Sequence, residues 1–180
     1  NYIYGTSDKA LWVNLFIGNT TEVTIDGKKV VMKQETDYPW DGLVKLTVTS
    51  EQPLGKELRI RIPGWCKSYT LSVNGNKVDS TTDKGYTVIK EWKTGDLIVL
   101  NMDMPVEKVS ADPRVRQNTG KRALQRGPLV YCLEETDNAK DFADLALTPT
   151  SSFEVKDEPD NLGGIRSIKA ISNGQTLHFI

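Results

Sequence analysis

The sequence is poor in the residues that most often bind metals or act as nucleophiles. Its 180 residues include a single histidine, His178, and two cysteines, Cys66 and Cys132. These residues lie far apart, and no CxxC or HxxxH spacing occurs, so the pattern of a zinc site is missing. A histidine-dependent nucleophile would have to rely on His178, close to a chain end that is expected to fray. The pattern therefore indicates no catalytic, cofactor-binding or metal-binding residue.

An excess of charge of one sign and long apolar runs are also missing. The 23 lysines and arginines face 24 aspartates and glutamates, which gives a net charge of −1. No overall field would steer the chain to nucleic acid or to an anionic membrane surface. No apolar run approaches the ~20 residues that span a bilayer. We expect no nucleic-acid and no membrane partner, while 38% hydrophobic residues are enough for a packed core.

A hydrophobic period of two residues dominates residues 1–107. Asp26-Gly27 and Asn74-Gly75 are typical hairpin turns, and strands recur at about the 8–12-residue spacing of a β-sandwich. Parallel pairing would need helical crossovers, for which the sequence has no room. The fold class is therefore all-β, and residues 1–107 are predicted to form an antiparallel β-sandwich. Its predicted strands are 11–17, 22–26, 29–35, 43–49, 57–62, 69–74, 86–92 and 96–102.

Residues 108–180 are predicted to form a second, smaller β-sandwich unit. A basic stretch at 109–126 precedes an acidic stretch at 134–160, and we interpret the two as pairing within this unit rather than as an anion-binding surface. Residues 141–147 fit either a short helix or a strand. The predicted strands are 123–126 and 129–133 around Gly127-Pro128, then 164–171 and 175–180.

The two ends of the chain suggest a piece of a larger protein. The sequence begins with Asn1-Tyr2 and ends in an apolar alternation without a turn or a polar tail. A processed mature chain is one explanation, and a fragment cut inside its last strand is the one we favour, so the second unit is expected to be incomplete. No compartment is assigned, since a targeting segment would lie before Asn1.

Six phrases in a fixed order carry a resemblance that spans nearly the whole chain. The phrases are LWVNLFI at 11–17, DYPWDG at 37–42, RIRIPGWC at 59–66, WKTGD at 92–96, ADPRV at 111–115 and ALQRGPLVYC at 123–132. Together they resemble the bacterial β-L-arabinofuranosidase family of glycoside hydrolases.

The resemblance implies a catalytic (α/α)6 barrel that is absent from this sequence. In the family, a zinc-bound cysteine nucleophile and a glutamate acid/base lie in that barrel, which precedes two β-sandwich units. Cys66 and Cys132 do not match the positions of the catalytic cysteines. The resemblance therefore implies no catalytic residue and no metal ligand here, and places the zinc in the barrel of the same parent chain.

Aromatic residues in turns are the best candidates for contact with a sugar or with another domain. Trp12 and Trp92 follow apolar strand patterns and are expected in the core. Trp40, with Asp41 beside it, and Trp65 lie in turns, where a ring can stack on a sugar or rest on the barrel. Of these two roles we prefer the contact with the barrel.

The acids and cysteines offer little support for chemistry within this chain. Asp26, Asp41 and Asp96 lie in turns, where a carboxylate normally satisfies the backbone. Cys66 and Cys132 fall in different units, so both are expected to be free and mostly buried.

These observations predict a non-catalytic C-terminal β-sandwich region of a glycoside hydrolase that packs against the barrel. The parent reaction implied by the resemblance is hydrolysis of terminal arabinofuranosides in plant glycans. The alternative is a stand-alone carbohydrate-binding module that uses Trp40 or Trp65. An adhesion or assembly domain is a third class, for which no sequence feature names a partner.

Overall fold

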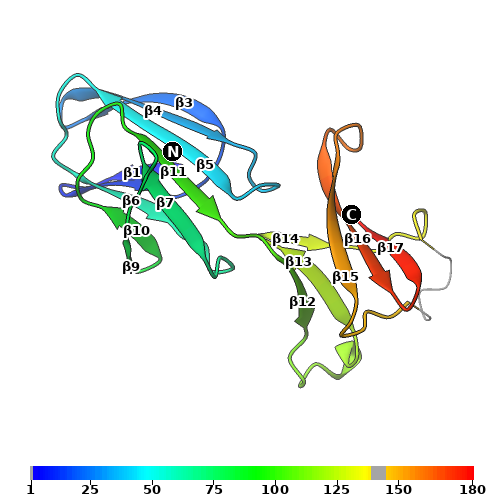
Figure 1. Cartoon of the computed structure of the whole chain (residues 1–180). Coiled ribbons are helices and arrows are strands. Elements are labelled where there is room, and N and C mark those ends of the chain that lie inside the picture. Colours follow the sequence, from blue (N-terminus) through cyan, green and yellow to red (C-terminus); the bar gives the residue numbers. More distant parts are fainter. Residues whose placement is uncertain (1, 139–144) are drawn as a thin grey trace. The chain divides into compact units, whose positions relative to one another are not determined.

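The computed structural model describes residues 2–138 and 145–180, which form two compact all-β units (Figure 1). The first unit is Asn1–Met104 and the second is Pro105–Ile180. The pattern of many short strands, predicted from the alternation of apolar and polar residues, is confirmed. Most of the segment 141–147, predicted as a helix or a strand, lies outside the described residues, and 145–147 are irregular. Among the described residues, no helix has the length and hydropathy that crossing a membrane requires.

One sheet of the first unit has five strands and is not purely antiparallel. β2 and β6 run parallel, with Trp12 opposite Arg59. The sequence argument against parallel pairing was wrong here, because the chain between these strands crosses through the other sheet instead of a helix. The strand order is β1 (Tyr4–Thr6), β2 (Ala10–Val13), β6 (Glu57–Arg61), β10 (Tyr86–Ile89) and β9 (Thr81–Asp83).

The second sheet of this unit has six strands, all paired antiparallel. Asp26-Gly27 and Asn74-Gly75 form the predicted hairpin turns, and Asp26, Gly27, Asn74 and Gly75 all have positive φ angles. The strand order is β3 (Asn19–Ile25), β4 (Lys28–Thr36), β5 (Leu43–Ser50), β11 (Leu97–Met102), β7 (Tyr69–Val73) and β8 (Asn76–Lys77).

The core of the first unit lies between these two sheets. Along β5, Val44, Leu46 and Val48 are buried, while Leu43 and Lys45 are exposed, as the period of two predicts. From the five-stranded sheet, Leu58 and other inward residues join the same cluster. Each fully buried aliphatic side chain contributes roughly 1.5–3 kcal/mol relative to an exposed one, so this alternation determines which face of each strand is covered.

The second unit contains two three-stranded antiparallel sheets with a core of their own. Leu124 and Tyr131 from the first of these sheets join Ile168 and Phe179 from the second in one buried cluster. The first sheet is β12 (Val106–Ser110), β13 (Arg122–Arg126) and β14 (Leu129–Tyr131), and the second is β15 (Ser152–Glu158), β16 (Ile165–Ser172) and β17 (Gln175–Phe179).

The end of the second unit is tied into its fold by backbone hydrogen bonds. The N–H of Cys132 donates to the carbonyl of Ile180 at 2.8 Å, and the N–H of Ile180 donates back at 2.9 Å. Leu133 also forms an isolated bridge with Phe179. The final residues of the chain therefore pair on one side with β16 and on the other with the segment after β14.

Candidate functional site

The turn between β4 and β5 contains two of the three residues singled out by the sequence, Trp40 and Asp41. Its Tyr38–Pro39 peptide bond is cis. The backbone N–H groups of Trp40 and Asp41 donate to the carbonyl of Asp37 at 2.9 and 3.3 Å. Asp41 Oδ1 accepts from the N–H of Leu43 at 2.7 Å, so this carboxylate satisfies the backbone where β5 begins. Both side chains are half-buried.

Gly42 closes this turn against the last residue of β11. Its carbonyl accepts from the N–H of Met102 at 3.0 Å. A Cβ atom at Gly42 would lie 1.9 Å from the carbonyl oxygen of Met102, far inside van der Waals contact. Glycine is needed here because two backbones approach closely, and the turn is thereby held firmly against the six-stranded sheet.

Trp65, the third candidate, contacts the turn through Tyr38. The two rings are stacked with centroids 6.4 Å apart and an interplanar angle of 23°. Tyr38 also meets Phe16 edge-on at 5.4 Å. Trp65 and Tyr38 are half-buried and pack against the core of the first unit. The structure thus brings the candidates to one end of the sandwich, with tyrosine as the link that the sequence did not reveal.

Apolar side chains next in sequence to Phe16 and to the turn are exposed. Leu15 and Ile17 flank the buried Phe16 and are 38% and 49% exposed, and Leu43, directly after the turn, is 36% exposed. The strand predicted over 11–17 is shorter in the structure, because β2 ends at Val13. We call this region, formed by Leu15, Ile17, Trp40, Leu43 and Trp65, the turn end.

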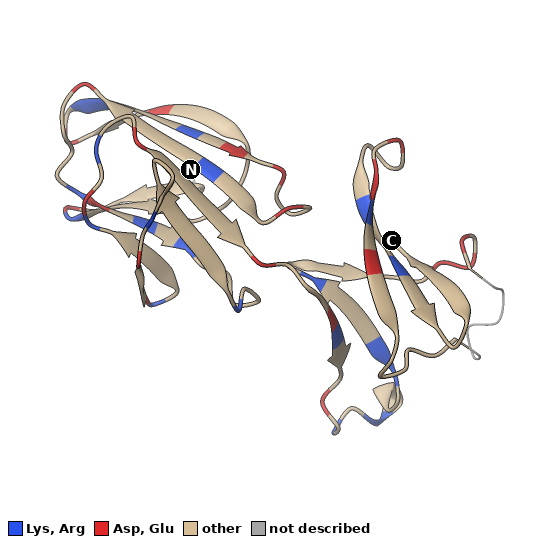
Figure 2. Ribbon diagram, viewed as in Figure 1, with Lys and Arg blue, Asp and Glu red and all other residues tan. Residues whose placement is uncertain are grey.

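A shallow hollow of about 240 Å³ beside the turn end has mixed charge. Glu35, Asp37, Asp41 and Lys45 border it. Glu35 forms an ion pair with Lys33 at 3.1 Å. Within the described ranges, no group of three or more His, Cys, Asp or Glu residues is placed to hold a metal ion. Figure 2 shows acidic and basic residues interleaved along the strands of the first unit.

The carboxyl groups with shifted pKa values have lowered values, which is the opposite direction from the shift that a general acid requires. Backbone and side-chain hydrogen bonds from Lys93 and Asn74 lower the pKa of Asp96. Arg114 lowers the pKa of Asp112, the acid with which it pairs inside the basic stretch. Side-chain hydrogen bonds from Asn161 and Ser167 lower the pKa of Glu158. A general acid of a glycosidase needs a raised pKa, so these three groups are suited to structural roles.

Both cysteines are free, as predicted, but they differ in exposure. Cys66 is half-buried beside Trp65, and its thiol donates to the carbonyl of Ser68 at 3.2 Å. Burial raises the pKa of the Cys66 thiol, which disfavours the reactive thiolate. Cys132 is exposed, whereas the sequence analysis expected it to be mostly buried.

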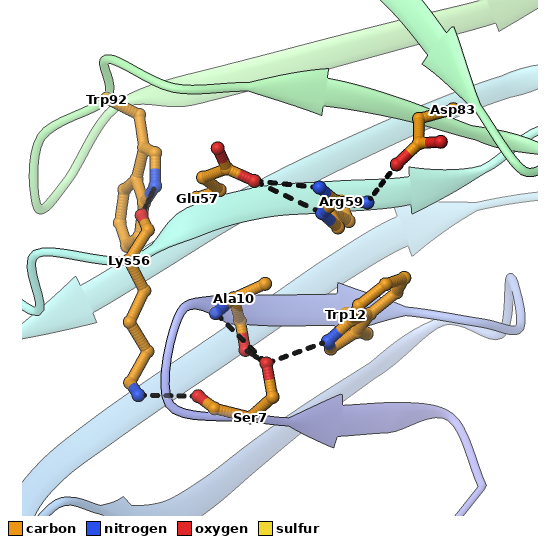
Figure 3. Close-up of polar contacts among 8 residues, drawn as sticks. All are labelled: Ser7, Ala10, Trp12, Lys56, Glu57, Arg59, Asp83 and Trp92. Atoms are coloured by element: carbon orange, nitrogen blue, oxygen red, sulfur yellow. Dashed lines mark hydrogen bonds and ion pairs between the residues drawn. The ribbon is translucent and has the colours of Figure 1, made fainter.

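The main feature that the sequence analysis missed is on the outer face of the five-stranded sheet. Trp12 was expected in the core, but the guanidinium of Arg59 lies 5.0 Å from its ring centroid (Figure 3). Tyr86 also meets the Trp12 ring edge-on at 4.8 Å. Arg59 also pairs with Glu57 and Asp83. The signal was available, because Leu11 and Val13 point inward and the period of two places Trp12 outward.

The fold and the candidate site together indicate two β-rich units of the accessory type. Their polar side chains mainly hold loops in place. Residues 10–104 match the family model described as the middle domain of the glycoside hydrolase family 127 β-L-arabinofuranosidases, and residues 106–171 match that of the family's C-terminal domain. The chain therefore belongs to glycoside hydrolase family 127.

Individual relatives agree with this assignment. A non-reducing end β-L-arabinofuranosidase of Bifidobacterium longum subsp. longum is 36% identical over 178 residues, which cover 93% of this chain and 26% of the relative. A solved β-L-arabinofuranosidase of the family from Geobacillus stearothermophilus T6 is 40% identical with a TM-score of 0.90, over 99% of this chain and 32% of its own. A second solved β-arabinofuranosidase of the family is 31% identical with a TM-score of 0.89. The chain thus spans about a quarter to a third of its relatives' length.

Proposed function

We propose that this chain is the non-catalytic middle and C-terminal region of a β-L-arabinofuranosidase, and that it buttresses the catalytic barrel of the same parent chain. The observation that carries the proposal is that the two matched domains are the middle and C-terminal ones, and that the chain covers only 26–32% of the relatives' length. The parent would release terminal arabinofuranosides from plant glycans. The zinc implied by the family resemblance would be bound in the barrel.

The turn end is the surface that we assign to the barrel contact. Leu15, Ile17 and Leu43 expose apolar area beside Trp40 and Trp65, on a backbone that Gly42 holds in place. Covering such a patch removes apolar surface from water and contributes roughly 25 cal/mol per Å². This role is favoured over sugar stacking because Trp65 already has one ring face on Tyr38 and packs against the core.

The catalytic part of the proposal is tested by comparing the chain with its parent. We expect the full-length parent, and not the 180-residue chain, to release p-nitrophenol from p-nitrophenyl β-L-arabinofuranoside. Turnover by the purified chain, undiminished after a second purification step, would show that the region is catalytic and overturn this half of the proposal.

The docking part is tested by the double variant Leu15→Ser with Ile17→Ser, made in both the chain and the parent. In the chain alone, the double variant should cost about 1–3 kcal/mol, since about half of each side chain is already covered within the unit. In the parent, the Tm should fall by several degrees more than it does in the chain. Leu97→Ser is the matched control, because Leu97 is 39% exposed and lies away from the turn end on β11. A parent Tm that falls no more than that of the chain would exclude the turn end as the contact.

A further inference from the structure

A hollow of about 350 Å³ opens where β5 ends, and it takes no part in the barrel contact proposed for the turn end. It lies between the loop that follows Ser50 and the loop between β10 and β11. Its volume falls in the range of small-ligand sites and suits a single sugar ring. We call it the lysine pocket, and the lining residues that matter are Ser50, Leu54, Lys56, Lys90, Trp92 and Lys93.

Hydrogen bonds between its two loops make the lysine pocket a preformed site. Thr94 Oγ1 accepts from the N–H of Ser50 at 2.7 Å and donates to the carbonyl of Ser50 at 3.0 Å. The indole N–H of Trp92 donates to the carbonyl of Lys56 at 2.8 Å, as Figure 3 shows. Trp92 and Leu54 also pack against the core of the unit. One wall is therefore a fixed apolar surface that includes an aromatic ring.

The charge of the lining is entirely positive. Of the residues that the structure describes, three lysines and no acidic residue border the pocket. Lys56 is already satisfied, because its Nζ donates to the carbonyls of Ser7 and Asp8 at 2.6 and 3.0 Å and pairs with Asp26 at 2.9 Å. Lys90 and Lys93 are exposed and form no direct ion pair within the described ranges, although Asp96 interacts electrostatically with Lys93. These two ammonium groups are left to meet a ligand.

Ser50 borders the same pocket where β5 ends. Ser50 is 8% exposed, and its Oγ has no hydrogen-bond partner within the described part of the chain. It is the last inward position of β5, in line with Val44, Leu46 and Val48. A buried polar atom without a partner is costly unless water or a ligand group reaches it. Because this hydroxyl is buried on the inward face of β5, it faces the core and does not meet a ligand in the pocket.

We infer that the lysine pocket binds an acidic sugar, namely a uronate residue of a glycan. The apolar face of the sugar ring would lie on Trp92 and Leu54, as sugar rings lie on aromatic surfaces. Its carboxylate would accept charge-assisted hydrogen bonds from Lys90 and Lys93. An inorganic anion would use the lysines and leave the apolar wall uncovered, and a neutral sugar would use the wall and leave the lysines unpaired. The uronate satisfies both, so it is the occupant that the lining fits.

The test is a titration of the ¹⁵N-labelled chain with methyl α-D-galacturonoside, followed by two-dimensional NMR at constant ionic strength. We expect the indole N–H signal of Trp92 to shift while that of Trp12, on the outer face of the five-stranded sheet, stays in place. The neutral methyl α-D-galactoside should bind about ten-fold more weakly or worse, since it lacks the charged acceptor.

Lysine variants decide whether the assigned residues carry the binding. Lys90→Gln with Lys93→Gln should weaken the uronate about ten-fold, and the fold should survive because both side chains are exposed. Lys77→Gln, an exposed lysine on β8, is the matched control and should leave the affinity unchanged.

Three results would overturn the inference. The first is no shift of the Trp92 signal at uronate concentrations up to about 50 mM, which lies well beyond a millimolar dissociation constant. The second is equal affinity for the uronate and its neutral counterpart. The third is inorganic phosphate competing as strongly as the uronate binds, which would leave an anion site with no role for the sugar ring. None of these outcomes depends on the barrel contact proposed above.

Discussion

Replacing Gly42 with alanine should destabilise the first unit strongly, although the change adds only a methyl group at the surface end of a strand. The new Cβ would lie 1.9 Å from the carbonyl oxygen of Met102, whereas real contacts of this type stay above about 3.0 Å. The two backbones must therefore separate by about 1.1 Å. Met102 is 2% exposed and belongs to the core, so the shift would also disturb packing.

The magnitude follows from what this separation breaks. The Met102 N–H to Gly42 carbonyl distance would grow from 3.0 Å to about 4 Å, which is too long for a hydrogen bond. The lost bond costs about 0.5–1.5 kcal/mol net, and overpacking typically costs about 1–3 kcal/mol. We expect a loss of about 2–4 kcal/mol, which for a unit of this size corresponds to roughly 10–20 °C in Tm.

The assay is urea unfolding of Gly42→Ala followed by tryptophan fluorescence. All 4 tryptophans lie in the first unit, so this signal reports on that unit without a contribution from the second. Gly64→Ala is the matched control, because a Cβ there meets nothing within 4 Å and Gly64 does not have a positive φ. The control should stay within about 0.5 kcal/mol of the parent sequence or gain slightly. A loss below about 1 kcal/mol for Gly42→Ala would refute the close-approach argument.

Two further predictions concern charged groups of the first unit. Lys56→Met should cost about 2–3 kcal/mol in urea unfolding, because the side chain of Lys56 is only 2% exposed and its removal leaves two carbonyls and Asp26 without their donor, whereas Lys77→Met should be near neutral. The folded-state pKa of Asp96 is lowered, so its contribution to stability is present above its unfolded pKa and is lost as the pH falls through the folded value. Asp96→Asn should therefore flatten the acid limb of stability against pH, and an unchanged limb would contradict this.

Strand position was predictable wherever a strand has one buried and one exposed face. β5, β6 and β7 lie where the alternation placed them, and β13 and β14 flank Gly127-Pro128 as predicted. The short strands β8 and β9 were missed because all their residues are exposed, which leaves no alternation to detect.

Pairing between distant segments could not be derived from periodicity. The parallel register of β2 on β6 depends on where the intervening chain goes, which local patterns do not encode. The same holds for the turn end. The sequence singled out Trp40 and Trp65 as turn residues, but their link through Tyr38 exists only because the aromatic rings meet after folding.

The roles of the charged residues at the lysine pocket could not be predicted from the sequence either. Lys56 and Lys90 look alike in the sequence, yet one is buried and fully bonded while the other is exposed at the pocket. The two lysines differ because Lys56 lies in the loop after β5. Its carbonyl accepts from Trp92 and its side chain reaches Ser7 (Figure 3). Counting lysines could not have located the site, because only two of the three lining lysines are available to a ligand.

The two proposed surfaces lie at opposite ends of one strand, which makes them separable. β5 begins at Leu43, in the turn end, and finishes at Ser50, in the lysine pocket. Seven residue steps at about 3.4 Å each place these positions roughly 24 Å apart. Substitutions that far apart with no shared partner act additively. Leu15→Ser with Ile17→Ser should therefore leave uronate affinity unchanged, and Lys90→Gln with Lys93→Gln should leave the parent's Tm unchanged.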